Sequence, residues 1–106
     1  MSRDKVLSFL GLATKAGKVV SGEFMTAKGI KEGNVCLVIL PLDASENTKK
    51  KFRNMCDYYQ VPLHFYSDKS SLGHAIGKEF RASVGVLDQG FADGIVDKIV
   101  MELGRN

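Results

Sequence analysis

Two aspartates stand at positions where a sheet could bring carboxylates together. Asp43 follows an apolar run that ends at Leu40, and Asp88 follows one that ends at Leu87. Ligands in open α/β sheets bind beyond the carboxyl ends of the strands, so these aspartates could hold Mg²⁺ or accept a phosphoryl group. The alternative role, a helix cap or turn former, is the one that we expect for both.

The histidines and cysteines do not form a metal or catalytic pattern. His64 and His74 are ten residues apart, with no cysteine or carboxylate at zinc-ligand spacing. Cys36 and Cys56 belong to no CxxC pair and lie in apolar stretches, which is typical of buried thiols in a reducing compartment. The sequence also has no Walker loop, nucleophile elbow or GxGxxG motif. We therefore expect no metal, no cofactor and no catalytic residue.

Lysines offer a different chemistry, the neutralisation of phosphate groups. Fifteen Lys and Arg against twelve Asp and Glu leave a formal charge of +3, which is a modest bias towards an anionic partner. The segment 21–23 leads into a predicted helix on which Lys28 and Lys31 lie about 60° apart. Both lysines could reach one phosphate backbone beside the helix N-terminus, which itself favours anions.

Lys69 is a third lysine of interest, because it falls in the first turn of a short predicted helix. A cation there opposes the helix macrodipole, which suggests that Lys69 faces something negative. Ordinary solvated lysines remain the alternative at all three positions. A further cluster, Lys49, Lys50, Lys51 and Arg53, is typical of the solvated face of a helix.

The elements that position these residues alternate between helices and short apolar strands. We predict strands at 18–20, 35–40, 63–66 and 83–87. Helices are expected between them: one capped by Ser2, one from 22 to about 32, one capped by Asp43 or Ser45, a short one after 67–68, and one over about 91–103. The run 35–40 has no polar position, which is typical of a central strand covered on both faces.

This alternation predicts one domain over residues 1–106, an α/β/α sandwich around a small mixed, largely parallel sheet. No apolar run approaches the roughly 18 residues of a membrane span, and the N-terminus lacks the apolar core of a signal peptide. We therefore expect a cytoplasmic protein that has no contact with membranes. A monomer is the default expectation.

Five segments, in register, resemble the L-seven-Ae family of ribosomal proteins, which includes the L-thirty-e proteins. They are KVVSG at 18–22, LVIL with DAS at 37–45, CDYYQVP at 56–62, LGHAIGK at 72–78 and DQGFA at 88–92. The Ser21-Gly22-Glu23 entry, the paired tyrosines and DQGFA are most similar to the bacterial YlxQ-like branch. The resemblance spans nearly the whole chain. It implies a three-layer α/β/α fold and a non-enzymatic protein that binds structured RNA, kink-turn-like and possibly ribosomal.

The resemblance also implies which edge meets the RNA. Family members use the loop that enters the second helix, the start of that helix, and the loop before the last strand, which lies against an extruded nucleotide. Together with the lysines above, the predicted RNA-binding residues are Ser21, Gly22, Glu23, Phe24, Lys28, Lys31, Lys69, Glu79, Phe80 and Arg81.

One part of the family pattern is absent. Kink-turn readers carry Asn-Glu followed two residues later by lysine, and the polar pair reads the edges of sheared G·A pairs. Here the helix start aligns as FMTAK at 24–28, so only the lysine remains. The spacing predicts that Phe24 packs inward with Ala27 and Ile30. The alternative is that Phe24 stacks on an unpaired base.

Two other functions remain open at this stage. The chain could be a protein-interaction module on the same fold, or a phosphotransfer or Mg²⁺-binding domain that uses Asp43 and Asp88. Nucleic acid that copurifies at low salt favours RNA binding. Phosphorylation that Asp88→Asn abolishes favours the phosphotransfer domain, and partner capture that survives nuclease treatment favours the interaction module.

Overall fold

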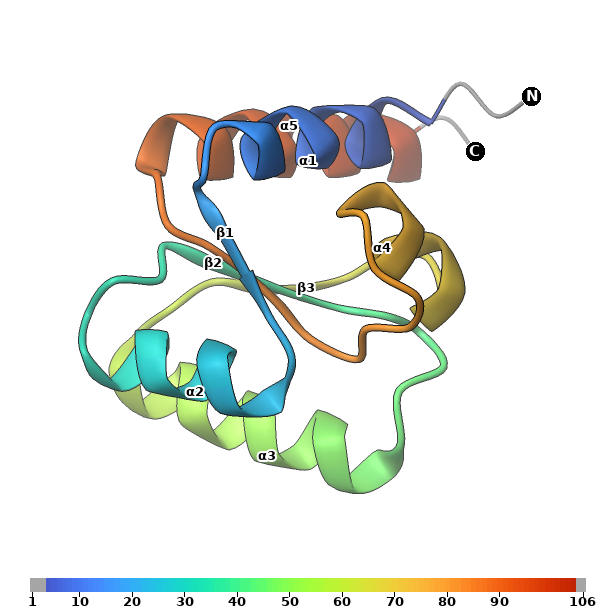
Figure 1. Cartoon of the computed structure of the whole chain (residues 1–106). Helices are drawn as coiled ribbons and strands as arrows, with labels where there is room; N and C mark the ends of the chain where they lie inside the picture. The colour runs from blue at the N-terminus through green and yellow to red at the C-terminus, as the bar shows by residue number, and fades with distance from the viewer. Residues whose placement is uncertain (1–3, 105–106) are drawn as a thin grey trace.

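A four-stranded sheet lies at the centre of the molecule, with helices on both of its faces (Figure 1). The computed structural model describes residues 4–104. In chain order the elements are α1 (Lys5–Lys15), β1 (Val19–Ser21), α2 (Glu23–Lys31), β2 (Leu37–Leu40), α3 (Glu46–Tyr59), β3 (Leu63–Phe65), α4 (Lys69–Ala75), β4 (Val84–Val86) and α5 (Gln89–Leu103). The predicted order and type of the elements are confirmed, although several ends move by one or two residues.

The strand order is β1-β4-β2-β3, in which β4 is antiparallel to both of its neighbours and β2 is parallel to β3. The predicted three-layer architecture and mixed sheet are confirmed, but the prediction of a largely parallel sheet is wrong. The reason is α4, which has 7 residues and therefore rises only about 10 Å. Such a short helix does not return the chain across the sheet, so β4 starts at the edge where β3 ended.

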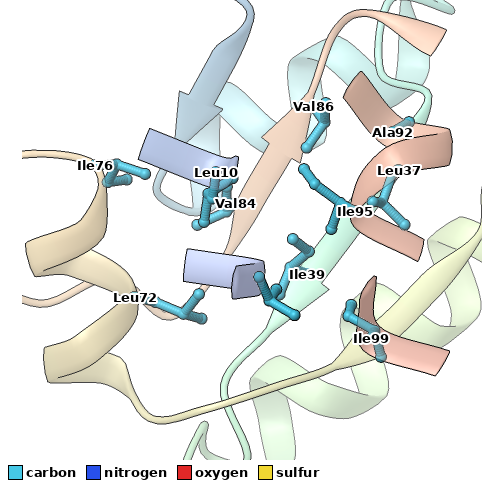
Figure 2. Close-up of a cluster of buried hydrophobic side chains, with 11 residues drawn as sticks. Leu10, Leu37, Ile39, Leu72, Ile76, Val84, Val86, Ala92, Ile95 and Ile99 are labelled. Atoms are coloured by element: carbon cyan, nitrogen blue, oxygen red, sulfur yellow. The ribbon is translucent and has the colours of Figure 1, made fainter. Parts of the chain in front are cut away.

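The strand β2 divides the hydrophobic core into two parts. Leu37 and Ile39 point to the face that α1, α4 and α5 cover, where they join a cluster with Leu10, Leu72 and Ile95 (Figure 2). The two alternate residues of β2 point to the other face, which α2 and α3 cover. All four residues of β2 are buried, as predicted for a central strand.

Helix α1 is tied to the connection between β3 and α4. The predicted cap Ser2 lies outside the described residues, and Asp4 caps α1 by accepting the Leu7 N–H at 2.9 Å. The Tyr66 hydroxyl donates to the same carboxylate at 2.7 Å. Burial, this hydrogen bond and the Asp4 charge raise the pKa of Tyr66 above its ordinary value, so the phenol stays protonated as a donor.

The two thiols differ in exposure. Cys56 is buried against the α2–α3 side of the sheet, and burial raises its pKa to about 11. Cys36 is only half-buried, so the prediction of two buried thiols is wrong for this residue. It lies just before β2, where its thiol donates to the Leu87 carbonyl at 3.7 Å. None of the helices within residues 4–104 is both long and apolar enough to cross a membrane.

Removal of the Tyr66 hydroxyl tests the link between α1 and the sheet. We expect Tyr66→Phe to lower the free energy of unfolding by about 1–2 kcal/mol, because the half-buried donor to a carboxylate is lost. Tyr58→Phe is the matched control, since the Tyr58 side chain is exposed. Urea denaturation of both variants measures the difference, and equal stabilities would contradict this role of Tyr66.

Candidate functional site

The carboxyl ends of β1, β2 and β3 lie at one edge of the sheet, on the right in Figure 1, and β4 begins there. Backbone hydrogen bonds join the connections at this edge. The Gly22 N–H donates to the Ser83 carbonyl at 3.0 Å, and the Leu42 N–H donates to the Ser67 carbonyl at 2.8 Å. We call these connections, residues 21–24, 41–45, 66–69 and 76–83, the loop edge.

Of the described helices that begin at the loop edge, α2 differs from α3 and α4 in its cap. Ser45 caps α3 through its hydroxyl. Asp43 and Asp68 both cap α4, where their carboxylates accept backbone N–H groups. Gly22 precedes α2 and supplies no side-chain cap. The first N–H groups of α2 are therefore available to an anion, and the helix dipole favours one.

Gly22 has backbone angles that other residues rarely adopt. Its φ is 87° and its ψ is 158°, a region that is essentially restricted to glycine. A Cβ at Gly22 would meet nothing within 4 Å. The backbone conformation, rather than lack of space, therefore requires glycine here, and it leaves open main chain in front of α2.

Arg81 holds the loop 76–83 against the end of β1. Its Nε donates to the Ser21 hydroxyl at 3.0 Å, and its Nη1 donates to the Phe80 carbonyl at 2.7 Å. The Arg81 backbone N–H donates to the Lys69 carbonyl at 3.2 Å. Arg81 therefore contacts two other predicted RNA-binding residues, Ser21 and Lys69. In this arrangement Arg81 positions the loop from within the protein.

Two phenylalanine side chains project from the loop edge into solvent. Phe24 is 76% exposed and Phe80 is 64% exposed. The prediction that Phe24 packs inward with Ala27 and Ile30 is wrong. The buried positions of α2 are Thr26, Ala27, Gly29 and Ile30, so the small side chains at 26 and 29 turn the inner face of the helix away from Phe24.

The predicted lysines occupy three different settings. Lys28 is exposed and lies one turn beyond Phe24 on the outer side of α2, about 40° around the helix. Lys31 is exposed at the opposite end of α2, in its last turn and away from the loop edge. Lys69 is half-buried at the start of α4, and the carboxylates of Asp43 and Asp68 at that turn offset its unfavourable position in the helix dipole.

An ion pair joins the start of α2 to α3. The Glu23 carboxylate is 2.6 Å from Nζ of Lys51. Lys51 lies beside the predicted site but was not predicted as part of it, because the two residues are 28 positions apart in the chain. Glu79, the remaining predicted residue, is exposed in the loop 76–83.

The two aspartates do not form a joint site. Asp43 follows β2, while Asp88 follows β4, which runs in the opposite direction with Leu37 paired to Val86. Asp43 accepts the Lys69 N–H, and Asp88 accepts the Phe91 N–H at 2.9 Å and caps α5. The two carboxylates thus lie beyond opposite ends of the sheet, as separate helix caps. Within residues 4–104, no group of three or more His, Cys, Asp and Glu could hold a metal ion.

The chain belongs to the Ribosomal protein L7Ae/L30e/S12e/Gadd45 family, whose model matches residues 4–96. This finding agrees with the fold and confirms the resemblance in the sequence.

Similar proteins include a member of the bacterial branch that the sequence indicated and a ribosomal protein. The RNA-binding protein YlxQ of Bacillus subtilis is 46% identical over 96 residues, which cover 91% of this chain and 96% of that protein. The large ribosomal subunit protein eL8 of Cenarchaeum symbiosum is 29% identical and covers 94% of this chain and 80% of its own. A solved structure of a Bacillus halodurans protein of unknown function is 41% identical, covers 92% of this chain and 98% of its own, and superposes with a TM-score of 0.89.

The position of the loop 76–83 depends on Gly73 of α4. A Cβ at this residue would overlap the Glu79 carbonyl oxygen and lie 3.0 Å from the Phe80 nitrogen. Both are backbone atoms, so a larger residue displaces the loop as a whole. The loop 76–83 therefore packs directly against the Gly73 backbone, and the hydrogen bonds of Arg81 fix the other side of the loop.

We expect Gly73→Ala to lower the free energy of unfolding by about 1–3 kcal/mol, the usual cost of overpacking, although alanine is the better helix former. Amide hydrogen exchange should become faster in the loop 76–83, because the loop can no longer pack closely against residue 73. Ser70→Ala is the control in the same helix, at an exposed position. Unchanged exchange in Gly73→Ala would show that the loop does not need this close approach.

Proposed function

We propose that the chain is a non-enzymatic, cytoplasmic protein that binds kinked or bulged RNA through its loop edge. The observation that carries this proposal is the start of α2, where an uncapped helix end, an unpaired lysine and an exposed aromatic ring stand together. Helix N-termini and lysines bind phosphate, and aromatic rings stack on bases. Membership in a family of ribosomal proteins and the RNA-binding name of the Bacillus subtilis relative support the same function.

The phosphate contacts set the position of the RNA. Lys28 is held by no hydrogen bond or ion pair within residues 4–104, so its ammonium group is free to meet a phosphate. The open N–H groups of α2 lie one turn away, in front of Gly22. Contacts of this kind orient an RNA but do not read its sequence.

The two phenylalanines supply the preference for irregular RNA. A continuous duplex stacks its own bases and offers no free base face, whereas a bulge or kink exposes unpaired bases that can stack on aromatic side chains. Phe24 and Phe80 project from the two connections that the hydrogen bond between Gly22 and Ser83 joins. The kink-turn, in which bases are extruded beside a sharp bend, is the RNA shape that fits both rings.

Recognition therefore rests on shape and stacking in this chain. The positions where family readers carry Asn-Glu hold Phe24 and Met25, which cannot form the hydrogen bonds that read sheared G·A pairs. Both side chains are exposed, so they meet the RNA without being part of the core. The preference for one kink sequence over another should be correspondingly weak.

Lys28→Ala should weaken the binding of every RNA, because the contact is to phosphate. The slope of log affinity against log salt should become shallower by about 1, the share of one lysine–phosphate contact. Lys5→Ala is the control, since this lysine is exposed on α1, on the other face of the sheet. A salt titration by fluorescence anisotropy measures both slopes, and an unchanged slope for Lys28→Ala would contradict the proposal.

Phe24→Leu should weaken the binding of a kink-turn RNA by about 1–3 kcal/mol, the value of one base stacked on an aromatic ring. The leucine keeps an apolar side chain but has no ring face. The binding of the same duplex without its bulge should change little, because this duplex offers no unpaired base. Gel shifts with the two RNAs test the difference, and equal losses for both would show that Phe24 does not read irregular structure.

A further inference from the structure

The two helical layers of the molecule differ in charge. Lys28 and Lys31 exceed Glu23 by one charge on α2. Four cations exceed two carboxylates on α3, so this layer carries +3. On α1, α4 and α5 four lysines stand against three carboxylates, so that layer carries +1. Most of the excess charge on the helices therefore belongs to the layer of α2 and α3.

The outer side of α3 is lined by polar and aromatic side chains. Its exposed residues at helical spacing are Asn47, Lys50, Lys51, Asn54 and Tyr58, which we call the α3 strip. At 100° per residue they lie within about 100° of one another, and they extend for about 16 Å along the helix. Tyr58, with 79% exposure, has its ring packed against Tyr59 in a T-shaped pair with centroids 4.9 Å apart.

Some cations of α3 contact other groups of the protein, and one does not. Lys49 and Arg53 lie over the Phe65 ring, at 5.9 Å and 5.3 Å from its centroid, and so point towards β3. Lys51 reaches across to Glu23. Lys50 is exposed, and within residues 4–104 it forms no hydrogen bond or ion pair. Its charge is therefore free for a partner.

The α3 strip is continuous with the loop edge. The ion pair between Lys51 and Glu23 places the strip beside the first turn of α2, and α2 and α3 lie side by side on one face of the sheet (Figure 1). On α2, Phe24, Lys28 and Lys31 are spaced i, i+4 and i+7 and so share its outer side. At the far end, Lys31 and Tyr59 line the same pocket. An RNA strand that leaves the loop edge can therefore run along the outer sides of both α2 and α3.

We propose that the α3 strip binds the backbone and shallow minor groove of an RNA stem adjacent to the kink or bulge held at the loop edge. Lys50 meets a phosphate, and Asn47 and Asn54 offer the donors and acceptors that ribose 2′-hydroxyl groups require. The strip has no aliphatic side chain, and lysine is depleted at the cores of protein interfaces. An RNA partner therefore fits the strip better than a protein partner. This inference rests on the proposed function.

The test uses the whole chain and four bulged hairpin RNAs in which each of the two stems is either short or extended by a helical turn. Binding is measured by fluorescence anisotropy over a range of salt concentrations. Extension of one stem should raise the affinity of the unmodified protein and steepen its log–log salt slope by about 1–2. Lys50→Glu should abolish this gain and leave the binding of the short-stem RNA nearly unchanged.

Lys5→Glu is the matched control, because it makes the same change in net charge at an exposed position of α1, on the other face of the sheet. It should keep the gain from the longer stem. Equal slopes for all four RNAs, or a gain that survives Lys50→Glu, would overturn the role of the α3 strip. If the strip binds a protein instead, Lys50→Glu and Tyr58→Ala leave all four RNA affinities unchanged, which also overturns it. In each outcome that overturns only the role of the α3 strip, the protein still binds the RNA with two short stems. Failure of the unmodified protein to bind any of the RNAs overturns the proposed function itself.

Discussion

The pairing of β1 with β4 is the interaction on which the loop edge depends. β1 has three residues and lies at one side of the sheet, and within the described sheet β4 is its single neighbour. Helix α2 follows β1 directly, so its start is placed by this ladder and by the hydrogen bond from Gly22 to Ser83. The hydrogen bond from Arg81 to Ser21 also fixes the loop 76–83 against the end of β1. One short ladder thus sets the distance between the two connections that carry Phe24 and Phe80.

The helices that begin at the loop edge differ in how their first turns are capped. Carboxylates and a hydroxyl satisfy the starts of α3 and α4 from within the protein, and this capping stabilises those helices. The start of α2 lacks such a cap, and the exposed rings of Phe24 and Phe80 contribute little to the core. In the proposed function, phosphate groups and bases cover these features of the isolated protein. This is the pattern expected where a fold supports a binding surface rather than its own stability.

The two faces of the sheet differ in the size of their buried clusters and in the charge of their helices. The face under α1, α4 and α5 holds the larger buried cluster, which Figure 2 shows, and its helices α1 and α5 carry balanced charge. The other face holds the smaller cluster under α2 and α3, whose helices carry the excess of cations. In the proposed function, the layer with the excess of cations is the one that faces the RNA.

The sequence alone determined the elements that local pattern controls. The unbroken apolar run at β2 predicted a central strand, apolar periodicity predicted the helices, and Gly22 with the five family segments predicted where α2 begins and which family the chain joins. The tertiary structure alone decided the direction of β4, and with it the separation of Asp43 from Asp88. It also turned Phe24 outward and gave Arg81 its partner Ser21, 60 positions away. The physical reason is range: periodicity and capping act within a few turns of chain, whereas strand direction and long-range hydrogen bonds depend on how distant segments pack.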